Sequence, residues 1–238
     1  MIVYFSGTGN SRSVAEKLAR DGERVEEISA ITEDVLEDER IGIVFPVYCA
    51  DVPRAVAEFL KRVKLRSPYI FSVATAGGGA GRSHGSVAYL LNGQGVSLAY
   101  ADTVIMPDSC IAFATPAKAK TRLLERESGR VREIAEALDA GKRTAVKASA
   151  PFGAGTRLMW KFFKAIFGLD RKKATEACVG CGLCAAGCPV NNIEMRNGKA
   201  AFLGGSCENC FRCIQSCPER AIEFGRLKVN DRTQYLHE

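Results

Sequence analysis

The sequence contains little histidine and no long apolar segment. Only two histidines, His84 and His237, occur in 238 residues, so a zinc site built on histidine has almost no ligands available. A run of about 18 apolar residues, as a membrane-spanning helix needs, does not occur. Residues 1–5 lack the basic region of a signal peptide. We therefore expect a cytoplasmic chain whose ten cysteines stay reduced and act as ligands rather than as disulfides.

Strand and helix signals alternate over the first 145 residues. The predicted strands cover residues 2–5, 24–28, 41–45, 69–74 and 96–105. Strands that alternate with helices pair in parallel, and helices then cover both faces of the sheet. Five such units suit an α/β, flavodoxin-like fold, which is a doubly wound five-stranded parallel sheet of order 2-1-3-4-5. We assign this domain to residues 1–150.

Eight of the ten cysteines form two copies of one spacing. The first copy reads Cys178-x2-Cys181-x2-Cys184-x3-Cys188-Pro189, and the second begins 29 residues later. Three closely spaced thiolates can bind three irons of a [4Fe–4S] cluster, and the displaced fourth cysteine then binds the other cluster. We therefore predict two clusters with crossed ligation. One is held by Cys178, Cys181, Cys184 and Cys217, and the other by Cys207, Cys210, Cys213 and Cys188.

A pair of structural zinc sites is the alternative interpretation of these cysteines. Zinc prefers two CxxC pairs or cysteine together with histidine, whereas here four cysteines in one spacing are followed by proline. We therefore interpret residues 174–238 as a small C-terminal ferredoxin domain of the bacterial two-cluster type. Residues 151–173 are predicted to be a linker with a basic amphipathic helix, which either packs between the domains or contacts a partner or an anionic membrane surface.

Three loops that follow predicted strands suit a flavin. The first combines glycine with hydroxyl side chains and leads directly into a helix, which favours a phosphate, and it lacks the lysine of a nucleotide triphosphate loop. The second contains Tyr48, which is placed to stack on an isoalloxazine ring, and the third is rich in glycine. Each loop alone could be an ordinary turn or a mobile loop, but together they favour FMN. The predicted FMN-binding residues are Ser6, Gly7, Thr8, Gly9, Asn10, Ser11, Pro46, Val47, Tyr48, Cys49, Ala50, Thr75, Ala76, Gly77, Gly78 and Gly79.

The whole chain resembles the flavodoxin–ferredoxin fusion family, whose members are 4Fe–4S-binding proteins with a flavodoxin domain. The resemblance is carried by residues 5–11, 45–48, 106–108, 188–193 and 207–218. It implies FMN, two [4Fe–4S] clusters and electron transfer, mainly in anaerobes, and it supplies no substrate. Ala50 stands where many such flavin loops have glycine.

Acidic residues are scarce between residues 157 and 173, where six basic residues accompany only Asp170, and this segment supplies most of the net charge of +6. Because clusters and an FMN phosphate are anionic, the basic excess offsets the cofactors and does not indicate nucleic-acid binding. We predict an electron carrier with a redox protein partner, either a ferredoxin or an oxidoreductase. The alternative is an enzyme, a ferredoxin-dependent flavin reductase that acts on a quinone or nitroaromatic, although no acid–base pair is evident for it.

Overall fold

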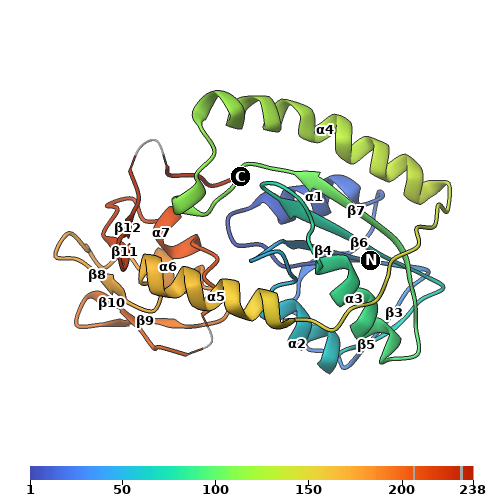
Figure 1. Cartoon of the computed structure of the whole chain (residues 1–238), viewed down its shortest axis with the longest axis horizontal. Helices are drawn as coiled ribbons and strands as arrows, with labels where there is room; N and C mark the ends of the chain where they lie inside the picture. The colour runs from blue at the N-terminus through green and yellow to red at the C-terminus, as the bar shows by residue number, and fades with distance from the viewer. Residues whose placement is uncertain (206, 231–232, 238) are drawn as a thin grey trace.

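A five-stranded parallel sheet forms the larger part of the molecule (Figure 1). The computed structural model describes residues 1–205, 207–230 and 233–237. In spatial order the sheet contains β2 (Val25–Glu27), β1 (Ile2–Tyr4), β4 (Arg40–Pro46), β6 (Tyr69–Ala76) and β7 (Leu98–Ile105). Counted along the chain within this sheet, the order is 2-1-3-4-5, and all neighbouring strands are parallel. The predicted flavodoxin-like fold is therefore confirmed.

Helices cover both faces of this sheet. The helices α1 (Asn10–Leu18) and α4 (Ala117–Asp139) pack on one face, and α2 (Arg54–Arg62) and α3 (Ser83–Asn92) pack on the other. Because both faces are covered, the central strands have no solvent side and are nearly continuous apolar runs. Every residue of β4 up to Phe45 is buried. The uninterrupted hydrophobicity that predicts this strand thus follows from its position in the sheet.

A small second sheet at the edge escaped the sequence analysis. It pairs β3 (Val35–Glu37) with β5 (Lys64–Arg66) in parallel. Each strand has three residues, and only the central one, Leu36 or Leu65, is buried. One apolar residue between two charged or exposed neighbours gives too short a pattern to predict a strand.

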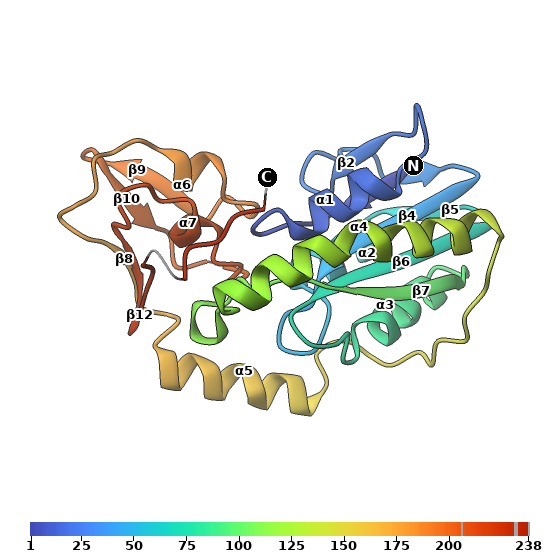
Figure 2. The ribbon, with the colours of Figure 1, turned by 90° about the horizontal axis from the view of Figure 1, so that it is seen from above.

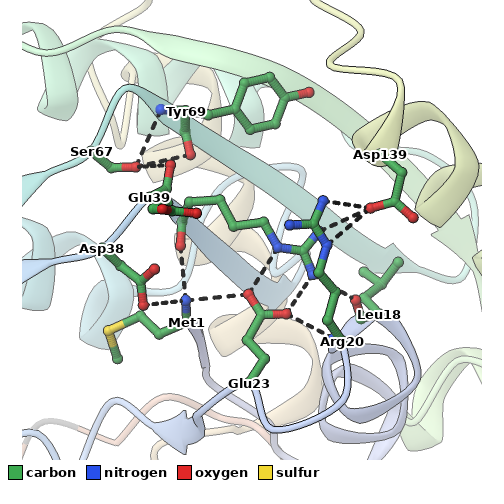
Figure 3. A network of polar contacts seen from close by, with 10 residues as sticks. Met1, Leu18, Arg20, Glu23, Asp38, Glu39, Ser67, Tyr69 and Asp139 are labelled. Carbon is green, nitrogen blue, oxygen red and sulfur yellow. Dashed lines mark hydrogen bonds and ion pairs between the residues drawn. The ribbon is translucent and has the colours of Figure 1, made fainter.

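A buried charge network closes the amino-terminal edge of the main sheet (Figure 3). The amino group of Met1 lies 2.7 Å from Asp38 Oδ2 and 3.2 Å from Glu23 Oε1. The guanidinium of Arg40 donates to the carboxylate of Glu23, and both side chains are less than a tenth exposed. Burial opposes ionisation of Glu23, but the hydrogen bonds from Arg40 and the Arg20 amide outweigh it and lower the Glu23 pKa to about 2. These groups pair with one another, and the loops predicted to bind FMN lie at the opposite edge of the sheet.

The rest of the chain forms α5 (Ala154–Phe167) and a compact cysteine-rich unit (Figure 2). That unit has a three-stranded sheet of β8 (Lys172–Ala174), β11 (Ile222–Phe224) and β12 (Leu227–Lys228), and a hairpin of β9 (Ile193–Arg196) and β10 (Lys199–Phe202). Two one-turn helices, α6 (Leu183–Ala186) and α7 (Arg212–Gln215), carry cysteines. Within the described ranges, no helix combines the length and the apolar character needed to cross a membrane.

The internal repeat is visible in the backbone of the cysteine-rich unit. Residues 29 positions apart share the left-handed conformation, which side chains other than glycine adopt rarely. These pairs are Gly180 and Asn209, Gly182 and Phe211, and Asn191 and Arg220. The strands β9 and β11 also begin at equivalent residues, Ile193 and Ile222. The two copies therefore share one chain path, as the repeat in the sequence predicts.

Candidate functional site

The three predicted flavin loops meet at the carboxyl edge of the main sheet. All the predicted FMN-binding residues except Gly9 line one cavity of about 300 Å³. Its polar end contains Ser6, Thr8, Asn10 and Ser11, from the loop between β1 and α1. Among the described residues that line it, there is no lysine or arginine. A phosphate at this end would therefore be held by hydroxyls, backbone N–H groups and the positive end of the α1 dipole.

The first loop is held in place from several directions. Ser11 Oγ lies 2.8 Å from Thr75 Oγ1, which joins the first loop to the third. The side-chain amide of Asn10 donates to the carbonyl oxygen of Pro107 at 3.0 Å. Gly9 has a φ of 98°, and a Cβ there would lie 1.7 Å from the carbonyl oxygen of His237, so only glycine fits. The loop is thus fixed by residues far from it in the sequence.

The second loop is a tight two-residue turn. Tyr48 and Asp51 each donate their backbone N–H to the other's carbonyl oxygen at 3.0 Å. The two residues between them, Cys49 and Ala50, have φ values of 48° and 59°. This is the type I′ pattern, in which the second position strongly favours glycine. Ala50, which stands where many such flavin loops have glycine, therefore has the positive φ that glycine tolerates best.

The buried carboxylate of Asp51 ties this turn to the start of α5. Its Oδ2 accepts from the backbone N–H of Phe152 at 2.9 Å and lies 3.4 Å from Thr156 Oγ1. Its Oδ1 accepts from Ser86 Oγ at 2.6 Å. Asp51 is fully buried, so these bonds replace the water that its carboxylate loses. The position of α5 is thereby linked to that of the second loop.

The outer wall of the cavity comes from residues that the sequence analysis did not assign to the site. They are Pro107, Asp108, Ser109, Cys110, Phe113, Met159, Trp160, Phe163, Phe167, Leu169, Asn209, Phe211 and Leu227. Residues 107–110 follow β7, at the same edge as the predicted loops, so the strand order could have indicated them. The residues of α5 and of the cysteine-rich unit lie far from the predicted loops in the sequence. No local sequence pattern indicates that they line the cavity.

Cys49 and Cys110 both line this cavity but are poor nucleophiles. Burial, with a smaller effect from Cys110, raises the pKa of Cys49 to about 11, and burial likewise raises the pKa of Cys110 to about 11. Thiols with such a pKa remain protonated at neutral pH. The raised pKa values therefore disfavour the thiolate form of both residues at neutral pH.

The eight remaining cysteines gather into two sites in the crossed arrangement. The outer cluster site, as we name it, is a small cavity lined by Cys178, Cys181, Cys184 and Cys217. The inner cluster site is lined by Cys188, Cys207, Cys210 and Cys213. Each set combines three cysteines of one copy with the fourth of the other. Four cysteine side chains at each site are the donor set of a [4Fe–4S] cluster.

Backbone amides point at the sulfurs of both sites. The N–H of Asn192 donates to Cys188 Sγ at 3.2 Å, and the equivalent N–H of Ala221 donates to Cys217 Sγ at 3.3 Å. Asn209 donates to Cys207 Sγ at 3.4 Å. Such bonds stabilise thiolate ligands and tune the reduction potential of a cluster.

The inner cluster site lies against the cavity. A Cβ on Gly7 would be 2.9 Å from both the Cβ and the carbonyl oxygen of Cys210, and 2.7 Å from Tyr48 Oη. The residues on either side of Cys210, Asn209 and Phe211, line the cavity. Glu208 accepts from the backbone N–H groups of Arg54 and Ala55 at 3.1 and 3.0 Å, at the start of α2. The loop that contains Cys210 therefore forms part of the wall of the cavity.

The C-terminal tail, residues 233–237, joins the same two parts from the other side. Tyr235 Oη donates to Asn10 Oδ1 at 2.6 Å, and the backbone N–H of His237 donates to the carbonyl oxygen of Thr8 at 2.8 Å. The backbone N–H of Tyr235 donates to Gln215 Oε1 in α7 at 2.9 Å. The tail thus connects the first loop with the second cysteine copy.

Comparison with known proteins identifies the cysteine-rich unit. Residues 171–218 match the family described as a 4Fe–4S dicluster domain. The C-terminal region is a 4Fe–4S dicluster ferredoxin domain. A ferredoxin from Pyrobaculum islandicum is 38% identical over 48 residues, which make up 20% of this chain and 45% of that protein. This ferredoxin domain therefore aligns with less than half of its relative.

Solved structures resemble the remainder of the chain only loosely. A putative flavoprotein from Bacteroides uniformis is 16% identical, with a TM-score of 0.35, and covers 52% of this chain and 96% of its own. The flavodoxin of Megasphaera elsdenii is 18% identical, with a TM-score of 0.35, over 56% of this chain and 96% of its own. It is the strand order that defines the fold here. An iron–sulfur domain joined to a flavodoxin-like fold supports electron transfer.

Proposed function

We propose that this chain is an electron-transfer protein that holds one FMN and two [4Fe–4S] clusters and exchanges electrons with a redox protein partner. FMN can exchange electrons singly or in pairs, and clusters pass them singly. The FMN would occupy the cavity at the carboxyl edge of the main sheet, with its phosphate among Ser6, Thr8 and Ser11. The crossed sets of four cysteines would hold the clusters.

The contact between Gly7 and Cys210 is the observation that carries this proposal. It brings the first flavin loop within van der Waals distance of a ligand of the inner cluster site. The outer cluster site lies beyond it, and its ligand Cys181 is exposed. Val179 and Leu183 beside it are 67% and 53% exposed. This order supports a path from the cavity through the inner site to the outer site, where a partner protein can approach.

The wall over the cavity supports a carrier rather than a flavin reductase for small acceptors. A reductase needs open space above the flavin for its acceptor. Here that side is lined by Trp160, Phe163 and Phe167 of α5 and by Phe113. The three phenylalanine rings form a stacked and edge-to-face group. We therefore expect reduced protein to react faster with a ferredoxin than with a quinone or nitroaromatic.

Anaerobic purification followed by metal and flavin analysis tests the proposal. We expect about eight iron and about one FMN per chain. Stoichiometric zinc with little iron, or full iron without any FMN affinity, would contradict it. The second test compares reoxidation of the dithionite-reduced protein by a ferredoxin with reoxidation by a quinone at equal driving force; faster reaction with the quinone would favour the enzyme.

A further inference from the structure

Helix α5 exposes a stripe of large apolar side chains. Leu158, Phe162 and Ile166 are 69%, 62% and 41% exposed, and their spacing of four residues puts them on one face of the helix. We name these three residues the α5 outer stripe. Figure 2 shows α5 lying along one side of the molecule, between the flavodoxin-like part and the ferredoxin domain. Single exposed apolar residues are ordinary, but a continuous row on one helix marks an interaction surface.

Packing between the two parts of the chain does not account for this stripe. The opposite face of α5 carries Met159, Trp160, Phe163 and Phe167, which line the cavity. The start of the helix is fixed by the hydrogen bonds of Asp51 to residues 152 and 156. The helix is therefore anchored by its inner face, and the outer stripe is presented to the surroundings.

A basic cavity borders the stripe. A second cavity of about 330 Å³ is lined by Arg54, Arg157, Lys161 and Lys164, and Glu208 supplies the single carboxylate among the described residues that line it. Glu208 is engaged by two backbone amides, and Lys164 lies 3.0 Å from Asp170. Arg157 and Lys161 form no ion pair within the described part of the chain. Two cations are thus free to bind an anion directly beside the apolar row.

We propose that α5 docks on an anionic membrane surface. The outer stripe enters the boundary between headgroups and acyl chains, and Arg157 and Lys161 bind lipid phosphate groups at the mouth of the second cavity. A helix with an apolar face next to basic residues has the composition of an interfacial membrane anchor, and each Lys or Arg near an anionic leaflet adds to binding. This inference does not depend on FMN or on cluster content.

The size of the stripe argues for lipid over a second copy of the chain. A stable protein interface buries roughly 800 Å² on each partner, which three side chains on one helix do not supply. A membrane requires no such complementary area, because apolar insertion and charge attraction add together. The basic residues beside the stripe complement an anionic surface, whereas an identical surface on a second copy would place cations against cations.

Vesicle sedimentation of the full chain with its cofactors, under anaerobic conditions, tests this proposal. One set of vesicles contains phosphatidylcholine only, and the other contains about one third phosphatidylglycerol. We expect binding to the anionic vesicles, and we expect it to weaken as salt is added because surface charges are screened. Equal binding to both sets, or binding to neither, would overturn the proposal.

Matched variants separate the stripe from the basic residues. We expect Leu158→Ser with Phe162→Ser to weaken vesicle binding about tenfold or more, because both lose apolar area that the lipid would cover. Lys161→Glu should weaken it about fivefold or more and reduce the effect of salt. The control is Tyr89→Ser with Leu203→Ser, which removes two exposed apolar side chains outside α5 and outside both cluster sites and should leave vesicle binding unchanged. Unaltered iron content verifies that each variant is folded.

Two further measurements distinguish the other occupants. If light scattering finds a dimer that Phe162→Ser dissociates, the stripe is covered by a second copy and the proposal is wrong. If soluble glycerol phosphate binds the cavity and the stripe variants still sediment like the unmodified protein, the basic residues serve a free phosphate ester instead of a lipid, and the proposal is equally wrong.

Discussion

The two cysteine copies of the ferredoxin domain share one spacing and one chain path but have different surroundings. Cys210 and Cys213 in the second copy are buried, whereas the equivalent of Cys210 in the first copy, Cys181, is exposed. Position 179 of the first copy is an exposed valine, and its equivalent in the second copy is the buried Glu208, which binds the start of α2. The spacing of the cysteines is the same in both copies, whereas the residues between the cysteines determine what surrounds each cluster site.

The difference extends to the backbone. Where the first copy has Gly180 and Gly182 in the left-handed conformation, the second copy has Asn209 and Phe211. A side chain in this conformation costs about 1 kcal/mol relative to glycine. Asn209 and Phe211 line the cavity, so the second copy has these two strained residues where the two parts of the molecule meet.

The largest expected effect comes from replacing the fourth cysteine of each copy with serine, one copy at a time. Cys188→Ser should remove the inner cluster, and Cys217→Ser should remove the outer one, because the ligation is crossed. We expect FMN to lose contact with any cluster in Cys188→Ser, so that electrons no longer pass from flavin to iron. In Cys217→Ser the flavin should still reduce the inner cluster, while transfer to a partner protein fails.

Electron paramagnetic resonance of the reduced variants checks this prediction, with transfer to a ferredoxin as the second readout. Each variant should retain about four of about eight irons. If Cys217→Ser instead eliminates the cluster of Cys207, Cys210 and Cys213, the crossed arrangement is wrong and the two copies are independent sites.

A smaller effect is expected from substituting Phe211 and Gly182, which precede α7 and α6 at equivalent positions of the two copies. Phe211 is 7% exposed and its ring lies 5.4 Å from that of Phe224. Phe211→Gly should lower the free energy of unfolding by about 2–4 kcal/mol, since the lost burial outweighs the relieved strain. Gly182→Ala should cost only about 1 kcal/mol, because a Cβ there meets no atom within 4 Å and only the φ of 77° is unfavourable.

Anaerobic denaturant unfolding of the two variants measures this difference. FMN affinity provides a second readout, because Phe211→Gly also opens the cavity wall whereas Gly182→Ala does not touch it. Similar losses of stability in both variants would show that the second copy gains nothing from its aromatic residue.

The sequence predicts the ligands of each copy better than their surroundings. Cysteine spacing and strand alternation are local patterns, so the fold class and the ferredoxin domain could be predicted and are confirmed. The contacts that distinguish the copies are not local. Tyr235 binds Asn10 across 225 positions, and Gln215 binds Ser109 across 106. Such contacts depend on how the two parts pack, which no periodicity encodes. The assignment of individual residues to FMN stays a prediction.

The C-terminal tail provides the next comparison, because the hydrogen bonds that its described residues form with the ferredoxin domain include those to Gln215 and Cys217 of the second cysteine copy. Tyr235→Phe removes the hydrogen bond to Asn10 and keeps the ring. One buried hydrogen bond contributes about 1 kcal/mol, so FMN affinity should fall by up to about fivefold as the first loop becomes less ordered. The control is Tyr89→Phe, which changes a half-exposed tyrosine of α3. Fluorescence titration with FMN distinguishes the two, and equal affinities would mean that the tail does not organise the loop.

The smallest effect concerns Ala50, which shares the left-handed conformation with Phe211 but contributes no cavity-filling ring. Its φ of 59° belongs to the type I′ turn between Tyr48 and Asp51. Its carbonyl oxygen accepts from the N–H of Arg82 at 2.8 Å, which holds the turn in this form. Ala50→Gly should therefore raise the free energy of unfolding by up to about 1 kcal/mol, reduced by the greater freedom of glycine in the unfolded chain. The reduction potential of bound FMN should change little, because the strain exists before reduction.

The same substitution in a regular helix, Ala165→Gly in α5, should destabilise by about 1 kcal/mol, so the two variants differ in sign. A clear shift of the flavin potential in Ala50→Gly alone would mean that the turn rearranges on reduction, and that residue 50 limits this rearrangement.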